Sequence, residues 1–218
     1  MTHSLSVRTL APADDGRRER LCSRRCASGL PLLVVALLAS CASPVPPPAL
    51  YQLRAAPPVP VPVQALASTQ VLQLLLPVAV PEALHRDTLL VPQGQGGVKA
   101  LAGHRWAEPL ADAVPRLLRQ DLSALLGDSR VWAAPLPAGV AITRQLRVEI
   151  LALQATPDRS AVLLEARWTL SDPAGRTAPQ VQTTQITAPS IGTDADALAA
   201  AHRLALWRLA EQVAPALR

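Results

Sequence analysis

The sequence predicts an α/β chain of the α+β kind, with a mixed, largely antiparallel sheet packed by two main helices. Three segments at 146–150, 162–170 and 181–187 favour strands by alternation or by β-branched composition, and turn residues separate them. Two other segments, near 110–126 and 194–216, repeat apolar residues at helical spacing. The three strands follow one another directly, so they form an antiparallel meander in the C-terminal half.

The first 40 residues are typical of a secretory leader. Arg24 and Arg25 precede the apolar run Leu30–Ala39, which is interrupted only by Pro31. A basic region, an apolar core of this length and small residues before a cut site indicate a signal peptide. The run is too short to span a bilayer, which needs about 20 apolar residues.

The leader ends in Leu38-Ala39-Ser40-Cys41, which is similar to a bacterial lipobox. This pattern predicts cleavage between Ser40 and Cys41 and attachment of lipid to the Cys41 thiol. Several acyl chains bind a membrane far more stably than one. The alternative is an ordinary signal peptide followed by a chance cysteine.

Without the leader, the chain carries too little positive charge to indicate nucleic-acid binding. Fifteen basic and 13 acidic residues remain beyond residue 40, a net charge of +2, and the basic residues are scattered. Cys22 and Cys26 lie in the leader, so the mature chain keeps only the lipidated cysteine. This excludes a disulfide scaffold and a cysteine zinc site. We expect no metal and no cofactor besides the covalent lipid.

Residues 41–67 form a proline-rich tether, and we expect a single domain at 68–218. Prolines favour extended chain that acts as a semi-rigid spacer, although a plain disordered linker fits as well. A short strand is predicted near 50–54, at Tyr51-Gln52-Leu53.

The domain begins with strands. The uncharged run 71–80 favours a strand buried on both faces. Residues 88–91 and 98–101 flank the glycine-rich turn 93–97 and predict a hairpin. The turn lacks the lysine and the glycine spacing of a phosphate loop.

The first helix is expected to open at 104–110, with Pro109 in its first turn. Pro115 predicts a kink there, or a helix that begins there. Asp121 falls on the apolar face, so it is either a catalytic acid or a buried group hydrogen-bonded to a neighbouring loop. Gly127 is expected to end the helix in the left-handed conformation.

A short strand at 131–134 precedes the meander, and the last helix follows it. Thr193 or Asp194 is expected to cap that helix. His202 lies on its apolar stripe and is expected to be a core histidine. Leu204 and Trp207 lie off the stripe and, with Trp106, are candidate contacts with a partner or a second subunit; a face covered by the chain itself is the alternative.

Taken in their order along the chain, these segments resemble the ABC-type transport auxiliary lipoproteins, the PqiC-like family. The most distinctive block is the Arg-Trp-Ala-Glu-Pro-Leu run at 105–110. The other matching segments are Cys41, Tyr51-Gln52-Leu53, Pro81 to Leu84, Asp121-Leu122 to Gly127, Leu163 to Trp168, and Ala200-Ala201-His202.

The resemblance implies a non-enzymatic docking subunit of an MCE-type lipid transport system. Its partners would be an MCE-domain protein with an ABC permease and ATPase, and it could form a homo-oligomer. Ala42, which is not Asp, predicts the periplasmic face of the outer membrane by the enteric sorting pattern. Two other functions stay open. One is a periplasmic hydrolase that uses Asp121, His104 or His202, and the other is a structural or adhesion lipoprotein.

Overall fold

The computed structural model describes residues 46–60 and 70–217, so the leader, the cut site at Ser40 and the predicted lipid site at Cys41 lie outside the described residues. The predicted α+β class with two main helices is confirmed, and the strands are divided between two sheets. The larger sheet has the order β5-β2-β6-β7-β8. Its strands are β2 Leu72–Leu74, β5 Val131–Ala133, β6 Arg144–Ala155, β7 Ala161–Ser171 and β8 Gln180–Pro189.

The antiparallel meander β6-β7-β8 is confirmed. Val148 pairs with Trp168, and Trp168 with Gln182. Leu146, Val148 and Ile150 are each at most 2% exposed, which places one face of β6 on the core. β2 is shorter than the expected strand over 71–80, and β5 and β6, both parallel to it, flank it. Its regular pairing stops before Pro77, which has no N–H to donate, and one further parallel bridge joins Ala79 to Glu149 of β6.

A second sheet of order β1-β4-β3 contains the predicted hairpin. Its strands are β1 Ala49–Tyr51, β3 Thr88–Gln93 and β4 Gly97–Trp106. The strand expected near 50–54 is therefore confirmed as β1, which pairs in parallel with the end of β4. We had expected the first helix to open at 104–110. Because β4 continues through Trp106, residues 104–106 are instead part of a strand.

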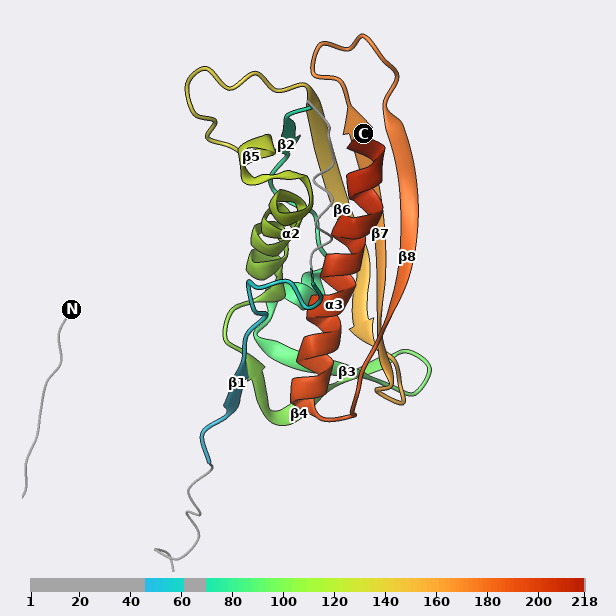
Figure 1. The fold of residues 1–218 in the computed structure, drawn as a ribbon. Coiled ribbons are helices and arrows are strands. Elements are labelled where there is room, and N and C mark those ends of the chain that lie inside the picture. The colour runs from blue at the N-terminus through green and yellow to red at the C-terminus, as the bar shows by residue number, and fades with distance from the viewer. Residues whose placement is uncertain (1–45, 61–69, 218) are drawn as a thin grey trace, which may run out of the picture. The chain divides into compact units, whose positions relative to one another are not determined.

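Two helices cover one face of the larger sheet (Figure 1). They are α2, Leu110–Leu126, and α3, Ala195–Val213, which pack against each other. Short 3-10 turns, η1 Glu82–His85, η2 Asp128–Arg130 and η3 Ala214–Leu217, link or end these elements. The hydrophobic core fills the space between helices and sheet, where Leu117, Leu164 and Leu206 are each at most 1% exposed. In the described part of the chain, no helix is both long enough and apolar enough to cross a membrane.

The ends of the helices differ in part from the predictions. Pro109 is the residue before the first turn of α2, and the helix runs through Pro115 instead of beginning there. Gly127 ends α2 at φ 103° and ψ 139°, a positive φ but not the left-handed helical conformation expected. Asp194 caps α3 as predicted, since its side chain accepts a hydrogen bond from the Ala197 amide.

Candidate functional site

Asp121 lies in the interior and is paired with Arg203, which the sequence analysis did not identify. The two Arg203 terminal nitrogens donate to the two carboxylate oxygens at 2.8 Å and 2.5 Å. The Asp121 side chain is 1% exposed and the Arg203 side chain is 5% exposed. Burial raises the pKa of Asp121, while the hydrogen bonds and charge of Arg203 oppose that rise. The carboxylate is thus occupied by a structural partner on the other helix, not on a neighbouring loop.

Arg203 also holds the chain that follows β1. Its Nε donates to the Arg54 carbonyl at 2.7 Å, and one terminal nitrogen reaches the Ala55 carbonyl at 3.4 Å. Leu53, directly before them, is 2% exposed. The folded body therefore includes part of the proline-rich segment ahead of residue 68, and one guanidinium joins that segment to α2 and α3.

His202 is a core histidine, as the sequence predicted. Its Nδ1 lies 2.7 Å from the Leu198 carbonyl, one turn earlier on α3. Its ring meets Trp106 edge to face, with the ring centroids 5.2 Å apart. Burial lowers the pKa of His202 to about 4, so the imidazole is neutral at physiological pH.

His104 occupies a different environment, beside the tyrosine of β1. The Tyr51 hydroxyl lies 2.9 Å from His104 Nδ1. In residues 46–60 and 70–217, no hydrogen bond joins any two of Asp121, His104 and His202, and no three metal-ligating side chains cluster. Each of the three candidate acid–base groups is thus hydrogen-bonded to a different partner in the described part of the chain.

The three candidate contact residues fall in different places. Trp106 is 4% exposed and Trp207 is fully buried, so both side chains fit the alternative of a face covered by the chain itself. Trp207 packs inward because α3 buries more of its circumference than the predicted stripe. Leu204 is half-buried and lines an open groove with Tyr51, Val59 and Ile191. Contact between Leu204 and a partner stays a prediction.

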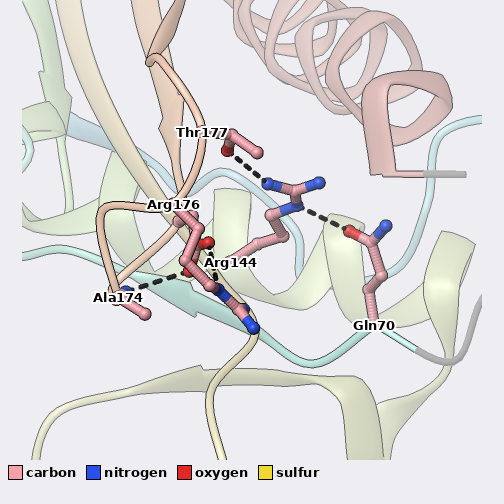
Figure 2. Close-up of polar contacts among 6 residues, drawn as sticks. Gln70, Arg144, Ala174, Arg176 and Thr177 are labelled. Atoms are coloured by element: carbon pink, nitrogen blue, oxygen red, sulfur yellow. Dashed lines mark hydrogen bonds and ion pairs between the residues drawn. The ribbon is translucent and has the colours of Figure 1, made fainter.

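A polar cluster lies at the start of β6 and the β7-β8 turn (Figure 2). Arg144 donates from Nε to the Gln70 side chain and from Nη1 to Thr177. Arg176 donates to Asp172, and the Ala174 amide donates to the same carboxylate. The Arg176 hydrogen bond is the main cause that lowers the pKa of Asp172 to about 2. These contacts fasten the turn to the sheet.

An apolar cavity of about 140 Å³ lies where η1 and β3 approach β6. Leu84, Leu90 and Leu153 contribute aliphatic walls, and Trp106 and His202 also line it. The polar cluster is charged, whereas the walls of this cavity are mostly hydrocarbon and His202 adds a neutral ring.

The sequence matches a known family. The family model described as "ABC-type transport auxiliary lipoprotein component" matches residues 51–214, nearly the whole described body. The chain belongs to this family. A transport auxiliary lipoprotein has an auxiliary role in an ABC-type transport system, which is consistent with a non-enzymatic protein. No curated protein matches the sequence.

Solved structures share the fold of this auxiliary lipoprotein. A protein solved as an uncharacterized protein is 18% identical, with a TM-score of 0.61 over 79% of this chain and 100% of its own. Protein XCC0632 from Xanthomonas campestris, of the DUF330 family, is 18% identical, with a TM-score of 0.60 over 76% and 92% of the two chains. At such identities the likeness shows the fold alone.

A dodecameric PelC from Paraburkholderia phytofirmans is a weaker neighbour of the auxiliary lipoprotein. It is 14% identical, with a TM-score of 0.41 over 72% of this chain and 94% of its own. That similarity is too low to carry an argument about assembly.

Proposed function

We propose that the protein is a non-enzymatic docking subunit of an MCE-type ABC lipid transport system, anchored by lipid at Cys41 on the periplasmic face of the outer membrane. The observation that supports this most is the family match over residues 51–214, which covers both helices and both sheets. The docking partner is an MCE-domain protein that works with an ABC permease and ATPase. Self-association of the chain is part of the same proposal.

The chemistry of the interior supports a binding role over catalysis. Asp121 accepts a hydrogen bond from Arg203 on each carboxylate oxygen, and His202 is buried with its Nδ1 against a backbone carbonyl. Both groups hold the fold together. A lipid anchor would strengthen docking, because a domain tethered to the membrane meets its partner at a raised effective concentration.

We expect the full-length lipidated protein, tagged and gently solubilised, to bring down an MCE-domain protein with its permease and ATPase. Mass spectrometry of the recovered proteins is the measurement. Recovery of general envelope proteins alone, under conditions in which a control complex survives, would contradict the docking role and favour the adhesion alternative.

The open groove beside Leu204 offers a matched pair of variants for the same experiment. Ile191 lines this groove and is fully exposed, while Val181 on β8 is 60% exposed elsewhere. If Leu204 marks the contact, Ile191→Glu is expected to reduce recovery of the partner at least about tenfold, since it buries a charge in the interface. Val181→Glu is the control and should leave recovery unchanged.

The anchor and its destination are tested by density fractionation of membranes. We expect the mature protein with outer-membrane markers, Ala42→Asp with inner-membrane markers, and Cys41→Ser in neither. Wild-type protein with inner-membrane markers would refute the proposed location, and membrane retention of Cys41→Ser would refute the anchor.

A further inference from the structure

We propose that the apolar cavity between η1, β3 and β6 is a binding site for a small neutral group that joins a hydrocarbon body to one hydroxyl. The inference goes beyond the docking role and does not depend on it. It rests on the shape of the wall, the position of His202 and the size of the space.

The wall of the cavity is built by an irregularity in β6. The register between β6 and β7 shifts between Ile150 and Ala152. In a regular strand alternate residues face opposite sides, but here four consecutive residues, 151–154, line the cavity. The bulge turns extra aliphatic surface toward the space, where β3 supplies Leu90 and Val91 from the other side.

His202 gives this apolar space a hydrogen-bond acceptor. A carbonyl can only accept, so the Nδ1 that lies 2.7 Å from the Leu198 carbonyl carries the proton. In the neutral ring, Nε2 is then a lone-pair acceptor, and no described residue donates to it. His202 is 3% exposed and lines the cavity. Because Nδ1 is turned back to its own helix, Nε2 lies at the other end of the ring, and we assign it to the side of the ring that lines the cavity.

A hydroxyl-bearing hydrocarbon suits this environment better than water does. A buried water typically makes about three hydrogen bonds, whereas a ligand needs only its hydroxyl to donate to Nε2 while its carbon atoms contact the walls. Leaving that hydroxyl unpaired in the cavity would cost the binding energy of a hydrogen bond or more. The hydrogen bond to Nε2 offsets the cost of removing the ligand hydroxyl from water. The site should therefore bind an alcohol or a phenol at least as tightly as a plain hydrocarbon of the same shape.

The volume limits what can enter. A cavity of about 140 Å³ resembles the engineered cavity of about 150 Å³ that binds benzene. Whole drug-sized ligands need about 300 Å³ or more. The occupant is then either a free molecule of about benzene size or the hydroxyl-bearing end of a longer amphiphile. Exposed Arg86 and Gln154 at the lining leave an opening for such an extension.

The test is isothermal titration of the full-length lipidated protein in micelles with phenol, with benzene, and with 1-octanol. We expect phenol to bind at least as tightly as benzene. Binding of both phenol and 1-octanol would indicate that the site takes the end of an amphiphile. Binding of phenol but not of 1-octanol would indicate that it takes a free small molecule. Absence of binding by both phenol and benzene would overturn the proposal.

Two pairs of variants separate the cavity from partition into micelles. Ala152→Phe fills the cavity and should abolish binding, while Ala200→Phe, on the exposed face of α3, should leave it intact. His202→Leu should weaken phenol about tenfold and leave benzene nearly unchanged. An unchanged ratio of the two affinities would overturn the role of Nε2.

A second measurement remains decisive if His202→Leu does not fold. In wild-type protein labelled with ¹⁵N-histidine, phenol should shift the His202 Nε2 resonance and benzene should not. Equal shifts with both probes, or none with phenol, would contradict the proposal. A failure here would leave the pull-down result untouched, because the two experiments address different surfaces.

Discussion

Replacement of Asp121 by alanine is expected to lower the free energy of unfolding by about 3–5 kcal/mol, the usual cost of removing one partner of a buried ion pair. The Arg203 guanidinium would keep its hydrogen bonds to the Arg54 and Ala55 carbonyls but lose both carboxylate bonds. Its side chain is only 5% exposed, so water cannot solvate the charge without local opening. Urea unfolding of the purified protein measures the loss.

Two variants control this prediction. Asp112→Ala removes a carboxylate from an exposed position in the first turn of α2 and should cost no more than about 1 kcal/mol. The double change Asp121→Leu with Arg203→Met replaces both charges and should recover much of the loss, because an apolar pair leaves no charge buried. A loss below about 1 kcal/mol for Asp121→Ala would show that the pair is not a structural element.

The same experiment bears on the hydrolase alternative. If Asp121 were a catalytic acid, its replacement would abolish function while leaving stability close to wild type. The geometry predicts the reverse order of effects, with stability lost first and docking lost only as a consequence. Loss of envelope integrity from a normally folded, normally assembled Asp121→Ala protein would therefore favour catalysis.

The local pattern of the sequence was sufficient for much of the fold. Alternation in β6 and β7 placed Val148 and Trp168 on one buried face, and both are 1% exposed. Asp194 was recognisable as a cap because it begins a helix with acidic residues at its positive end. These predictions succeeded because each depends on neighbours within a few residues in the chain.

The predictions that failed depend on distant partners. The strand expected over 71–80 was judged by composition alone, but its extent is fixed by which residues of β5 and β6 lie beside it. Likewise, β4 reaches Trp106 because β1 pairs there, and β1 is separated from it by more than 50 residues. Hydrophobic periodicity carries no information about such pairings.

The site shows the same division. Asp121 was identified as buried from its own helix, which correctly implied that it needs a partner. Arg203 was missed because it lies off the predicted stripe of α3, although α3 is buried on most of its circumference. The available signal was Ala199, one turn before Arg203 on the same side of α3, because a small residue at that position leaves room for a long side chain.

Acidification should weaken the protein through His202. The pKa of this residue is lowered to about 4 in the folded state by burial, against a usual value of about 6.5 when unfolded. Between these values the unfolded chain binds the proton and the folded chain does not, so stability rises with pH in this window. Stability is complete above about pH 6.5, and the loss reaches on the order of 3 kcal/mol by about pH 4.

Urea unfolding at several pH values would measure this slope, and substitutions assign it. His202→Gln cannot take up the proton and should flatten the slope between about pH 6.5 and 4. His85→Gln, at an exposed position in η1, is the matched control and should leave it unchanged. Burial raises the pKa of Asp121, so this group makes stability fall as the pH rises above about 3.8, opposite to His202. Both wild type and His202→Gln contain Asp121, so its contribution cancels when one pH profile is subtracted from the other. Parallel pH profiles for the two proteins would show that His202 protonates as readily in the folded state as in the unfolded one.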